Sequence, residues 1–131
     1  MPTFKKIERL CSKTAITILF EKGKSKTAQP LKLMYYPSVF ESNSPARCMF
    51  VVPKKKFKRA NKRNILKRRM REAYRLHKEE LYQALGERKL DLAFIYLSHE
   101  PAEYARIESA VKQLLTFLIQ QNSMSGEIKP L

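Results

Sequence analysis

The sequence predicts an α+β fold in a single domain. Its 131 residues suffice for one domain of ordinary size, and 44% of them are hydrophobic, so the chain can bury a core. Four short runs of strand character are set among three segments whose apolar residues recur at helical spacing. Their order is α-β-β-β-α-β-α, which is typical of a sheet with helices on one or both faces. Residues 1–121 make up this domain, and residues 122–131 are expected to be a flexible tail.

The N-terminal part combines a helix with the first two strands. Residues 9–20 have apolar side chains near helical spacing, and Ser12 can cap the start of this helix. A turn with one glycine follows, and any strand within residues 24–29 is short. Residues 31–36, LKLMYY, alternate between two faces, which predicts a strand.

Two further strands flank the longest helix. A loop with two prolines, residues 37–45, leads into the strand at residues 47–52, which Pro53 closes. The continuous apolar run of this strand indicates a more central place in the sheet. Residues 90–97, LDLAFIYL, form the last strand.

Two long amphipathic helices complete the fold. The first begins near residues 59–61 and ends at Leu85, and Gly86 is expected to stop it in the left-handed conformation. The second spans residues 102–121. Their apolar stripes are Leu66, Met70, Ala73, Tyr74, His77, Leu81 and Leu85 in the first helix, and Tyr104, Ile107, Ala110, Val111, Leu114, Leu115 and Leu118 in the second.

The charge of the chain is concentrated in one segment. Eleven of the 18 side chains in residues 54–71 are Lys or Arg, and no acidic residue occurs between Glu41 and Glu72. Residues 1–78 hold 22 basic and four acidic side chains, whereas residues 79–131 hold five basic and eight acidic ones. Like charges on one helix repel each other, so a segment that keeps them uncompensated is expected to bind an external polyanion, RNA or DNA.

A helical wheel sorts these charges onto one face of the long helix. With about 100° per residue, its basic side chains share an arc of about 100° beside the apolar stripe. Glu72 and Glu79 fall on the far flank, so we expect the acids to be kept away from the basic arc. The arc consists of Asn64, Lys67, Arg68, Arg71, Arg75 and Lys78. A solvated basic face, a membrane surface or a calmodulin-like partner remain alternatives to nucleic acid.

Other classes of function find little support. Cys11 and Cys48 form no CxxC motif, so both are expected to be reduced thiols. The N-terminus lacks the apolar stretch of a signal peptide, and no apolar run approaches the roughly 18 residues of a membrane span, so we expect a soluble, cytoplasmic protein. The carboxylates form no cluster that would hold catalytic metal ions, and His77 and His99 are expected to be non-catalytic. We therefore expect no catalytic residue in the protein itself.

The basic helix resembles the signature of a known family, the protein subunit of bacterial ribonuclease P. That signature is of the type R-N-R-x-x-K-R, usually followed by R-E-A. The matching residues are Ala60, Arg63, Asn64, Lys67, Arg68, Arg71, Glu72 and Ala73. Ile65 stands in place of the second signature arginine, with Arg69 or Lys62 as possible substitutes.

The N-terminal third is also similar to this family. Phe20 and Gly23 match its F-x-x-G segment, and Ile16 stands in place of an earlier aromatic residue. The resemblance spans roughly residues 8–118, because strands and helices also follow in the order of the family.

The resemblance implies a fold and a function. The fold would be like domain 2 of ribosomal protein S5, with a left-handed β-α-β crossover through the signature helix. The function would be to assist 5′ maturation of precursor tRNA. An RNA subunit would be the catalyst, with divalent metal (Mg²⁺) held mainly by that RNA, without an organic cofactor and without an obligate protein partner. The protein would bind this RNA and hold the 5′ leader of precursor tRNA between helix and sheet.

The site residues follow from the charge pattern and the resemblance together. The expected RNA-binding residues are Lys54, Lys55, Lys56, Arg59, Lys62, Arg63, Asn64, Lys67, Arg68, Arg71 and Arg75. The candidates for leader binding are Phe20, Tyr35, Tyr36, Phe50 and Ile16, because single strands stack on aromatic side chains in basic grooves. Each of the aromatic residues has the alternative of a place in the core. The alternative function is a structural, non-catalytic RNA-binding protein, such as a ribosomal protein.

Overall fold

The computed structural model describes residues 4–38 and 44–124, and its elements follow the predicted order. A short 3₁₀ turn, η1, precedes them. The elements are η1 (Lys6–Glu8), α1 (Lys13–Lys22), β1 (Lys24–Ala28), β2 (Leu31–Pro37), β3 (Ala46–Val51), α2 (Ala60–Leu85), β4 (Leu90–Tyr96) and α3 (Tyr104–Met124). The α+β prediction is therefore confirmed.

The four strands form one sheet in the order β1-β2-β4-β3. β1, β2 and β4 pair antiparallel, whereas β3 runs parallel to β4. The prediction that β3 is a central strand was wrong, because β3 lies at an edge. Its apolar run is nevertheless covered, since the chain before α1 lies along this edge: Arg9 bridges to Cys48, and the Leu10 N–H donates to the Cys48 carbonyl oxygen at 3.0 Å.

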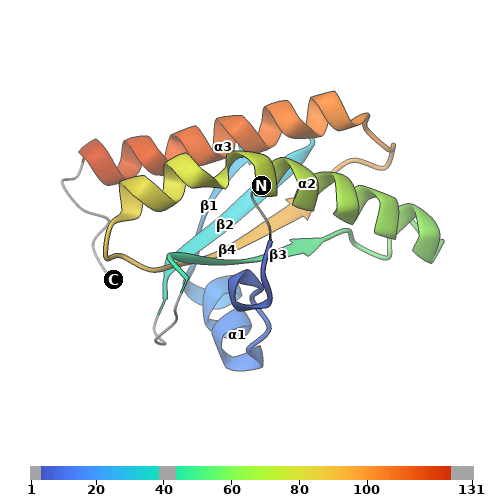
Figure 1. The fold of residues 1–131 in the computed structure, drawn as a ribbon. Helices are drawn as coiled ribbons and strands as arrows, with labels where there is room; N and C mark the ends of the chain where they lie inside the picture. Colours follow the sequence, from blue (N-terminus) through green and yellow to red (C-terminus); the bar gives the residue numbers. More distant parts are fainter. Residues whose placement is uncertain (1–3, 39–43, 125–131) are drawn as a thin grey trace.

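Helices cover both faces of the sheet, so the molecule has three layers (Figure 1). α2 and α3 lie side by side on one face, and α1 lies on the other. Alternation along β2 serves both faces: Leu33 and Tyr35 join the core under α2 and α3, whereas Tyr36 joins a smaller core with Leu19 of α1. Each face of the sheet therefore has a hydrophobic core of its own.

The connection from β3 through α2 to β4 is left-handed. In Figure 1 both strands run from left to right, β3 lies nearer the viewer than β4, and α2 returns above them. This path agrees with the crossover that the family resemblance implies, and it is an exception to the usual right-handed rule.

The helix boundaries differ from the predictions in three places. α1 begins at Lys13, because residues 9 and 10 pair with β3, and the predicted cap Ser12 accepts a hydrogen bond from the Ala15 N–H at 3.3 Å. α2 ends at Leu85, as predicted; Gly86 has the expected positive φ of 60°, but its ψ of −118° lies outside the left-handed helical region. α3 extends to Met124, into the predicted tail, and residues 125–131 lie outside the described residues.

Two expectations about chemical class can be compared with the structure. Cys11 is exposed and Cys48 is buried, and both are free thiols, as predicted. Across residues 4–38 and 44–124, no helix is both long enough and apolar enough to cross a membrane.

An aromatic cluster fills the core between β3, β4 and α2. Phe50 stacks on Phe94, with ring centroids 5.9 Å apart and an interplanar angle of 13°. Tyr74 of α2 packs edge-on against both rings, at 5.9 Å and 5.8 Å. Phe4, from the chain before η1, packs edge-on against Phe50 and Tyr74 at 5.7 Å and 5.8 Å. These contacts tie the N-terminal segment to the sheet and to α2.

Phe50→Ala should lower the free energy of unfolding by about 3 kcal/mol, because it removes a ring from this cluster and leaves a cavity. Phe20→Ala is the matched control: Phe20 is 41% exposed, so this change should cost less than about 1 kcal/mol. Urea denaturation of both variants measures the difference. Equal losses would contradict the contribution of the Phe50 ring contacts to stability.

Candidate nucleic-acid interface

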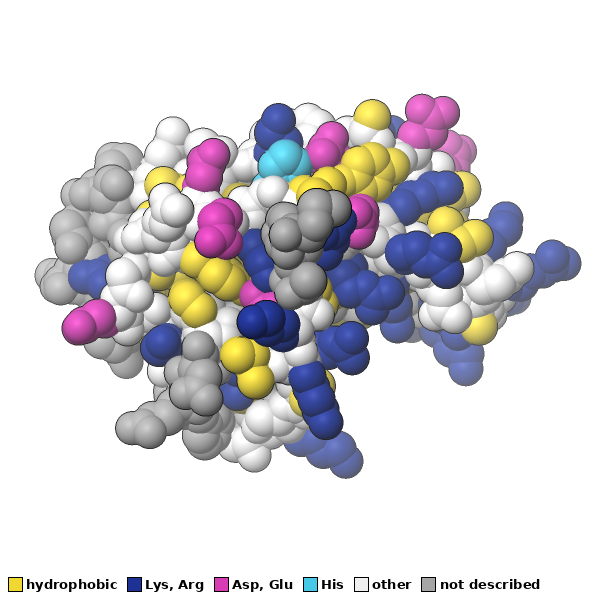
Figure 2. Space-filling view, viewed as in Figure 1, with side chains coloured by type: hydrophobic (Ala, Val, Ile, Leu, Met, Phe, Trp, Pro, Cys, Tyr) yellow, Lys and Arg dark blue, Asp and Glu magenta, His cyan; other side chains and the backbone are white. Residues whose placement is uncertain are grey.

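The basic surface forms where α2 extends beyond the core. Leu66 is the first buried side chain of α2, so the first turns of this helix lie outside the packed part of the molecule. Lys and Arg side chains gather around this end of α2 and continue toward α1 (Figure 2). A helix end that contributes nothing to the core can carry this charge without a desolvation cost.

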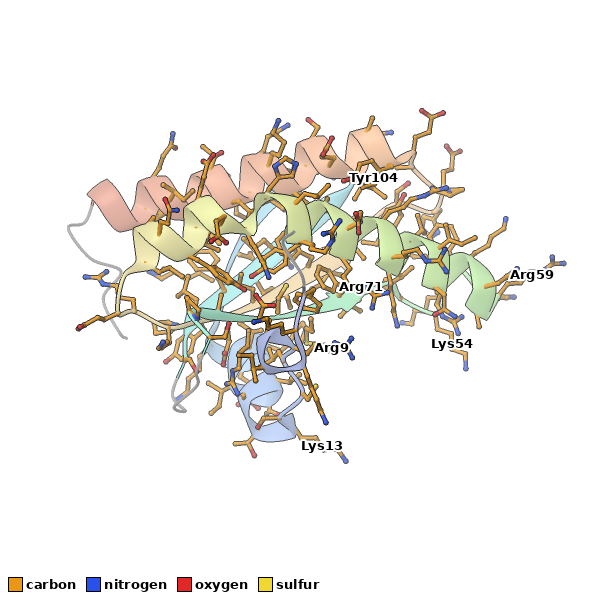
Figure 3. The ribbon with its side chains drawn as sticks, in the orientation of Figure 1. Arg9, Lys13, Lys54, Arg59, Arg71 and Tyr104 are labelled. Atoms are coloured by element: carbon orange, nitrogen blue, oxygen red, sulfur yellow. The ribbon has the colours of Figure 1, made fainter. Side chains whose placement is uncertain are left out.

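The expected RNA-binding residues are largely accessible. Those with exposed side chains are Lys54, Lys55, Arg59, Lys62, Asn64, Arg68 and Arg71, and those that are half-buried are Lys56, Arg63, Lys67 and Arg75. In Figure 3, Lys54 and Arg59 mark the right-hand end of the molecule, and Arg71 lies further back along α2. α2 and the loop before it therefore present one continuous basic surface.

The loop before α2 is held in place by two side chains. Phe57, the aromatic residue within the lysine run, is buried and packs edge-on against Tyr96 with ring centroids 5.7 Å apart. Arg63 donates from Nη1 to the carbonyl oxygens of Phe57 and Lys58, at 2.8 Å and 2.9 Å. Arg63 thus has a structural contact in addition to its place in the basic surface. The anchoring role of Phe57 in this loop was not predicted from the sequence. A lone aromatic residue within a run of lysines could have indicated it.

The helical wheel was wrong about two residues, Lys78 and Glu72. Lys78 is buried and pairs with Glu8, which comes from η1 and packs against α2. Glu72 is not kept away from the arc, because it forms an ion pair with Arg75 one turn along the helix. The hydrogen bond from Arg75 lowers the pKa of Glu72 below its ordinary value, so this acid is charged and compensates Arg75.

The two possible substitutes for the signature arginine at position 65 have different surroundings. Ile65 itself is 43% exposed. Arg69 donates from Nη1 to the carbonyl oxygen of Ala102 at 2.7 Å, which ties α2 to the chain before α3. Lys62 is exposed at the free end of α2. Of the two, Lys62 therefore has the more accessible charge.

Three of the leader-binding candidates pack in the hydrophobic core or against it. Tyr35 is buried and packs edge-on against Phe117 of α3 at 5.8 Å. Tyr36 is buried under α1. Phe50 is part of the aromatic cluster. Burial removes the two tyrosine rings from a stacking platform, because a base needs access to the ring face. Phe50 is half-buried, and its ring contacts Phe94 and Tyr74.

The other two candidates lie on α1. Phe20 is exposed and Ile16 is half-buried. Ile16 packs on the same small core as Met34 of β2 and Met49 of β3. α1 thus presents Phe20 beside a sheet face that is only partly covered.

The sheet face beside α1 contains residues that were not singled out from the sequence. Lys32, Met34, Met49, Val51 and Ile95 are half-buried, and the strand alternation places all of them on the α1 side. The alternation of β2 could have indicated this face, because the residues between its buried ones must lie on the opposite side of the sheet. An incompletely covered apolar surface with a lysine on it is suited to contact bases and phosphates.

Several carboxylates and His77 have structural partners. Within the described ranges, no three His, Cys, Asp or Glu side chains come together as a possible metal site. Asp91 pairs with Arg47 at 3.1 Å, and His77 contacts Glu108 at 2.8 Å, which joins α2 to α3. Burial raises the pKa of Asp91 in spite of this arginine. These contacts connect structural elements and form no donor set for a catalytic metal ion.

Comparison with known proteins identifies the family. The model of the family "Ribonuclease P" matches residues 4–118. The ribonuclease P protein component of Porphyromonas gingivalis strain W83 is 36% identical over 118 residues, which cover 87% of this chain and 86% of that protein. The ribonuclease P protein component of Chlorobium phaeobacteroides is 40% identical over 98 residues, which cover 72% and 67% of the two chains.

Solved structures show the same fold. The RNase P protein of Staphylococcus aureus superposes with a TM-score of 0.68 at 19% identity, over 84% of this chain and 94% of that one. The RNase P protein of Thermotoga maritima superposes with a TM-score of 0.66 at 23% identity, over 84% and 96%. The sequence relatives, the family model and the fold agree, and the chain therefore belongs to the ribonuclease P protein family.

Proposed function

We propose that this chain is the protein subunit of ribonuclease P, and that it assists removal of the 5′ leader from precursor tRNA by binding RNA. The observation that carries the proposal is the basic end of α2, which projects beyond the core in a chain of this family. The work of the subunit takes place in the cytoplasm, where tRNA is matured.

The first part of the proposal concerns the catalytic RNA. The exposed side chains of Arg59, Lys62, Arg68 and Arg71 follow α2 over several turns, at a rise of about 1.5 Å per residue. Successive phosphates can therefore be contacted along the helix, and arginine adds two parallel donors for phosphate oxygens. Asn64 is the neutral polar group in this row, able to bond a base edge or a 2′-hydroxyl.

The second part concerns the 5′ leader of the substrate. We assign it to the sheet face beside α1, where Phe20 is exposed and Ile16, Met34 and Met49 are half-buried. Lys32 on the same face supplies a charge for the backbone of the strand. Aromatic and apolar contacts with bases tolerate different sequences, which suits leaders that differ from one tRNA to another.

The third part concerns the chemistry. Glu8, Glu72, Asp91 and Glu108 each bind a basic side chain of the protein, and the described residues form no metal cluster. We therefore assign catalysis, with its Mg²⁺ ions, to the RNA subunit. The protein contributes binding and orientation of the two RNAs.

The experiment that tests this function adds the purified protein to ribonuclease P RNA and precursor tRNA at low magnesium concentration. Faster cleavage at the mature 5′ end is the expected result, because the basic surface replaces part of the screening by metal ions. Binding of the RNA without faster cleavage would contradict the proposal and would favour a structural RNA-binding protein.

Arg68→Ala and Arg71→Ala should each weaken binding to ribonuclease P RNA. Each change removes one exposed charge, so the slope of log K against log salt should become shallower by about 0.7 to 0.9. Lys112→Ala, on the exposed face of α3, removes the same charge away from α2 and should leave the slope unchanged. A salt titration of all three variants is the measurement. An unchanged salt slope in both arginine variants would show that these two side chains do not contact phosphates.

Phe20→Ala should weaken binding of precursor tRNA more than binding of mature tRNA, because only the precursor has a leader to stack on the ring. We expect a loss of about 1 kcal/mol or more for the precursor, measured as the ratio of the two Kd values for the holoenzyme. Leu76→Ala, which changes another exposed apolar residue outside α1, is the control. Equal losses for both tRNAs would remove Phe20 from the leader site.

A further inference from the structure

We infer that residues 4–13 form a second RNA-binding arm, in which Arg9 and Lys13 contact phosphates and the buried carboxylate of Glu8 positions Arg9. The inference deepens the proposed function and rests on it. It adds two binding residues outside α2, and it gives a role to the one acidic side chain of the basic N-terminal segment.

Glu8 is the centre of a buried polar contact between η1 and α2. Its side chain is 5% exposed, although it belongs to the N-terminal end of the chain. The carboxylate accepts hydrogen bonds from Lys78 Nζ, from the Tyr82 hydroxyl at 2.8 Å and from the Lys5 backbone N–H at 2.5 Å. Two of these three donors come from α2, so the carboxylate fixes η1 to the helix that carries the basic surface.

The charged state of Glu8 is consistent with this arrangement. Burial by itself would raise the pKa of Glu8, but the hydrogen bonds from Lys78, Lys5 and Tyr82 outweigh burial and hold the pKa below its ordinary value. Glu8 and Lys78 therefore form an ion pair at neutral pH. A buried ion pair contributes little net stability compared with apolar side chains of the same volume, because desolvation offsets the attraction. Its main effect here is to fix the position of the segment.

Contacts on either side of Glu8 dock the rest of the segment. Phe4 packs its ring against both Phe50 and Tyr74, and Lys78 Nζ lies 5.9 Å from the centre of the Phe4 ring. Leu10 is buried and donates its N–H to Cys48 of β3. Arg9 lies between the two buried residues Glu8 and Leu10, so its backbone is held on both sides.

The side chain of Arg9 points away from the core. It is exposed, whereas its two neighbours are buried, as expected for consecutive residues of an extended segment. Its guanidinium carbon lies 6.0 Å from the centre of the Phe4 ring, a cation–π distance that orients the group and leaves its hydrogen-bond donors available. Among the residues that the structure describes, neither Arg9 nor Lys13 forms an ion pair.

The arm and the basic surface of α2 face the same side of the molecule. Figure 3 shows Arg9 and Lys13 on the side toward which Lys54 and Arg59 also lie, with Arg71 on α2 above Arg9. An RNA strand bound along α2 would thus have a second row of charges below it. Two rows held at a fixed separation can contact phosphates of two strands, or of one strand that turns between them.

The test is a double-mutant cycle of Arg9→Ala and Glu8→Gln, with binding of ribonuclease P RNA and of precursor tRNA measured against salt. Arg9→Ala should weaken binding of at least one of the two RNAs by about threefold to tenfold and make its salt slope shallower by about 0.7 to 0.9. Glu8→Gln should also weaken that binding, although it removes a negative charge from a protein that binds a polyanion. In the Glu8→Gln background, Arg9→Ala should have little further effect.

The sign of the Glu8→Gln effect separates a positioning role from a simple charge. Glu21→Gln, an exposed residue of α1, removes the same charge without loosening the arm and should leave binding unchanged or make it tighter. Tyr82→Phe removes one donor to the Glu8 carboxylate and should give a smaller loss of the same kind, so the test does not depend on one variant. Leu118→Ala, in the α3 core, should lower stability without changing RNA binding in conditions where it is folded.

The results that overturn the inference are distinct from those that overturn the proposed function. If Arg71→Ala weakens binding and Arg9→Ala does not, the α2 interface stands and the arm carries no contact. If Arg9→Ala has its full effect in the Glu8→Gln background, Glu8 does not position Arg9. If neither Arg71→Ala nor Arg9→Ala changes binding of either RNA, the proposed interface is overturned together with the arm.

Discussion

The position of the basic surface depends on the residue of α2 at which burial begins. From Leu66 onward, this helix packs its apolar stripe on β3, β4 and α3, and Met70, Tyr74 and Leu81 are fully buried. Before Leu66, no side chain of α2 is buried, so the first turns of the helix stay outside the core. The hydrophobic contacts therefore provide a rigid base from which a cationic helix end extends. Rigidity of this kind lets charged side chains meet phosphates without first being ordered.

Compensation of charge is selective in this molecule. Glu8 and Glu72 neutralise Lys78 and Arg75, the last two basic side chains of α2. Toward the N-terminal end of the helix, Arg59 and Arg68 keep exposed charges. The predicted basic arc is therefore graded, with paired charges at its C-terminal end and exposed charges toward the N-terminal end of α2. A polyanion is thereby attracted most strongly to the projecting end of α2.

Patterns within single elements were sufficient for much of the fold. The 3.6-residue period located α2 to within a residue, because its stripe continues without interruption until Gly86. The alternation of apolar and polar residues located β2. The run of lysines and arginines located the basic surface on α2 and the loop before it. The place of β3 in the sheet was wrong, since an apolar run reports burial and not the strand order. Burial of its edge came from Arg9 and Leu10, which lie far away in the sequence.

The sequence by itself determined the fold class, the resemblance to the ribonuclease P proteins and the position of the basic segment, because these depend on local period and composition. Only the tertiary structure decided which side chains are available for binding. It buried Tyr35 and Tyr36, packed the half-buried Phe50 against the core, left Phe20 exposed, and paired Glu8 with Lys78 of a distant helix. Accessibility and charge compensation depend on contacts between segments far apart in the chain, and no local pattern contains that information.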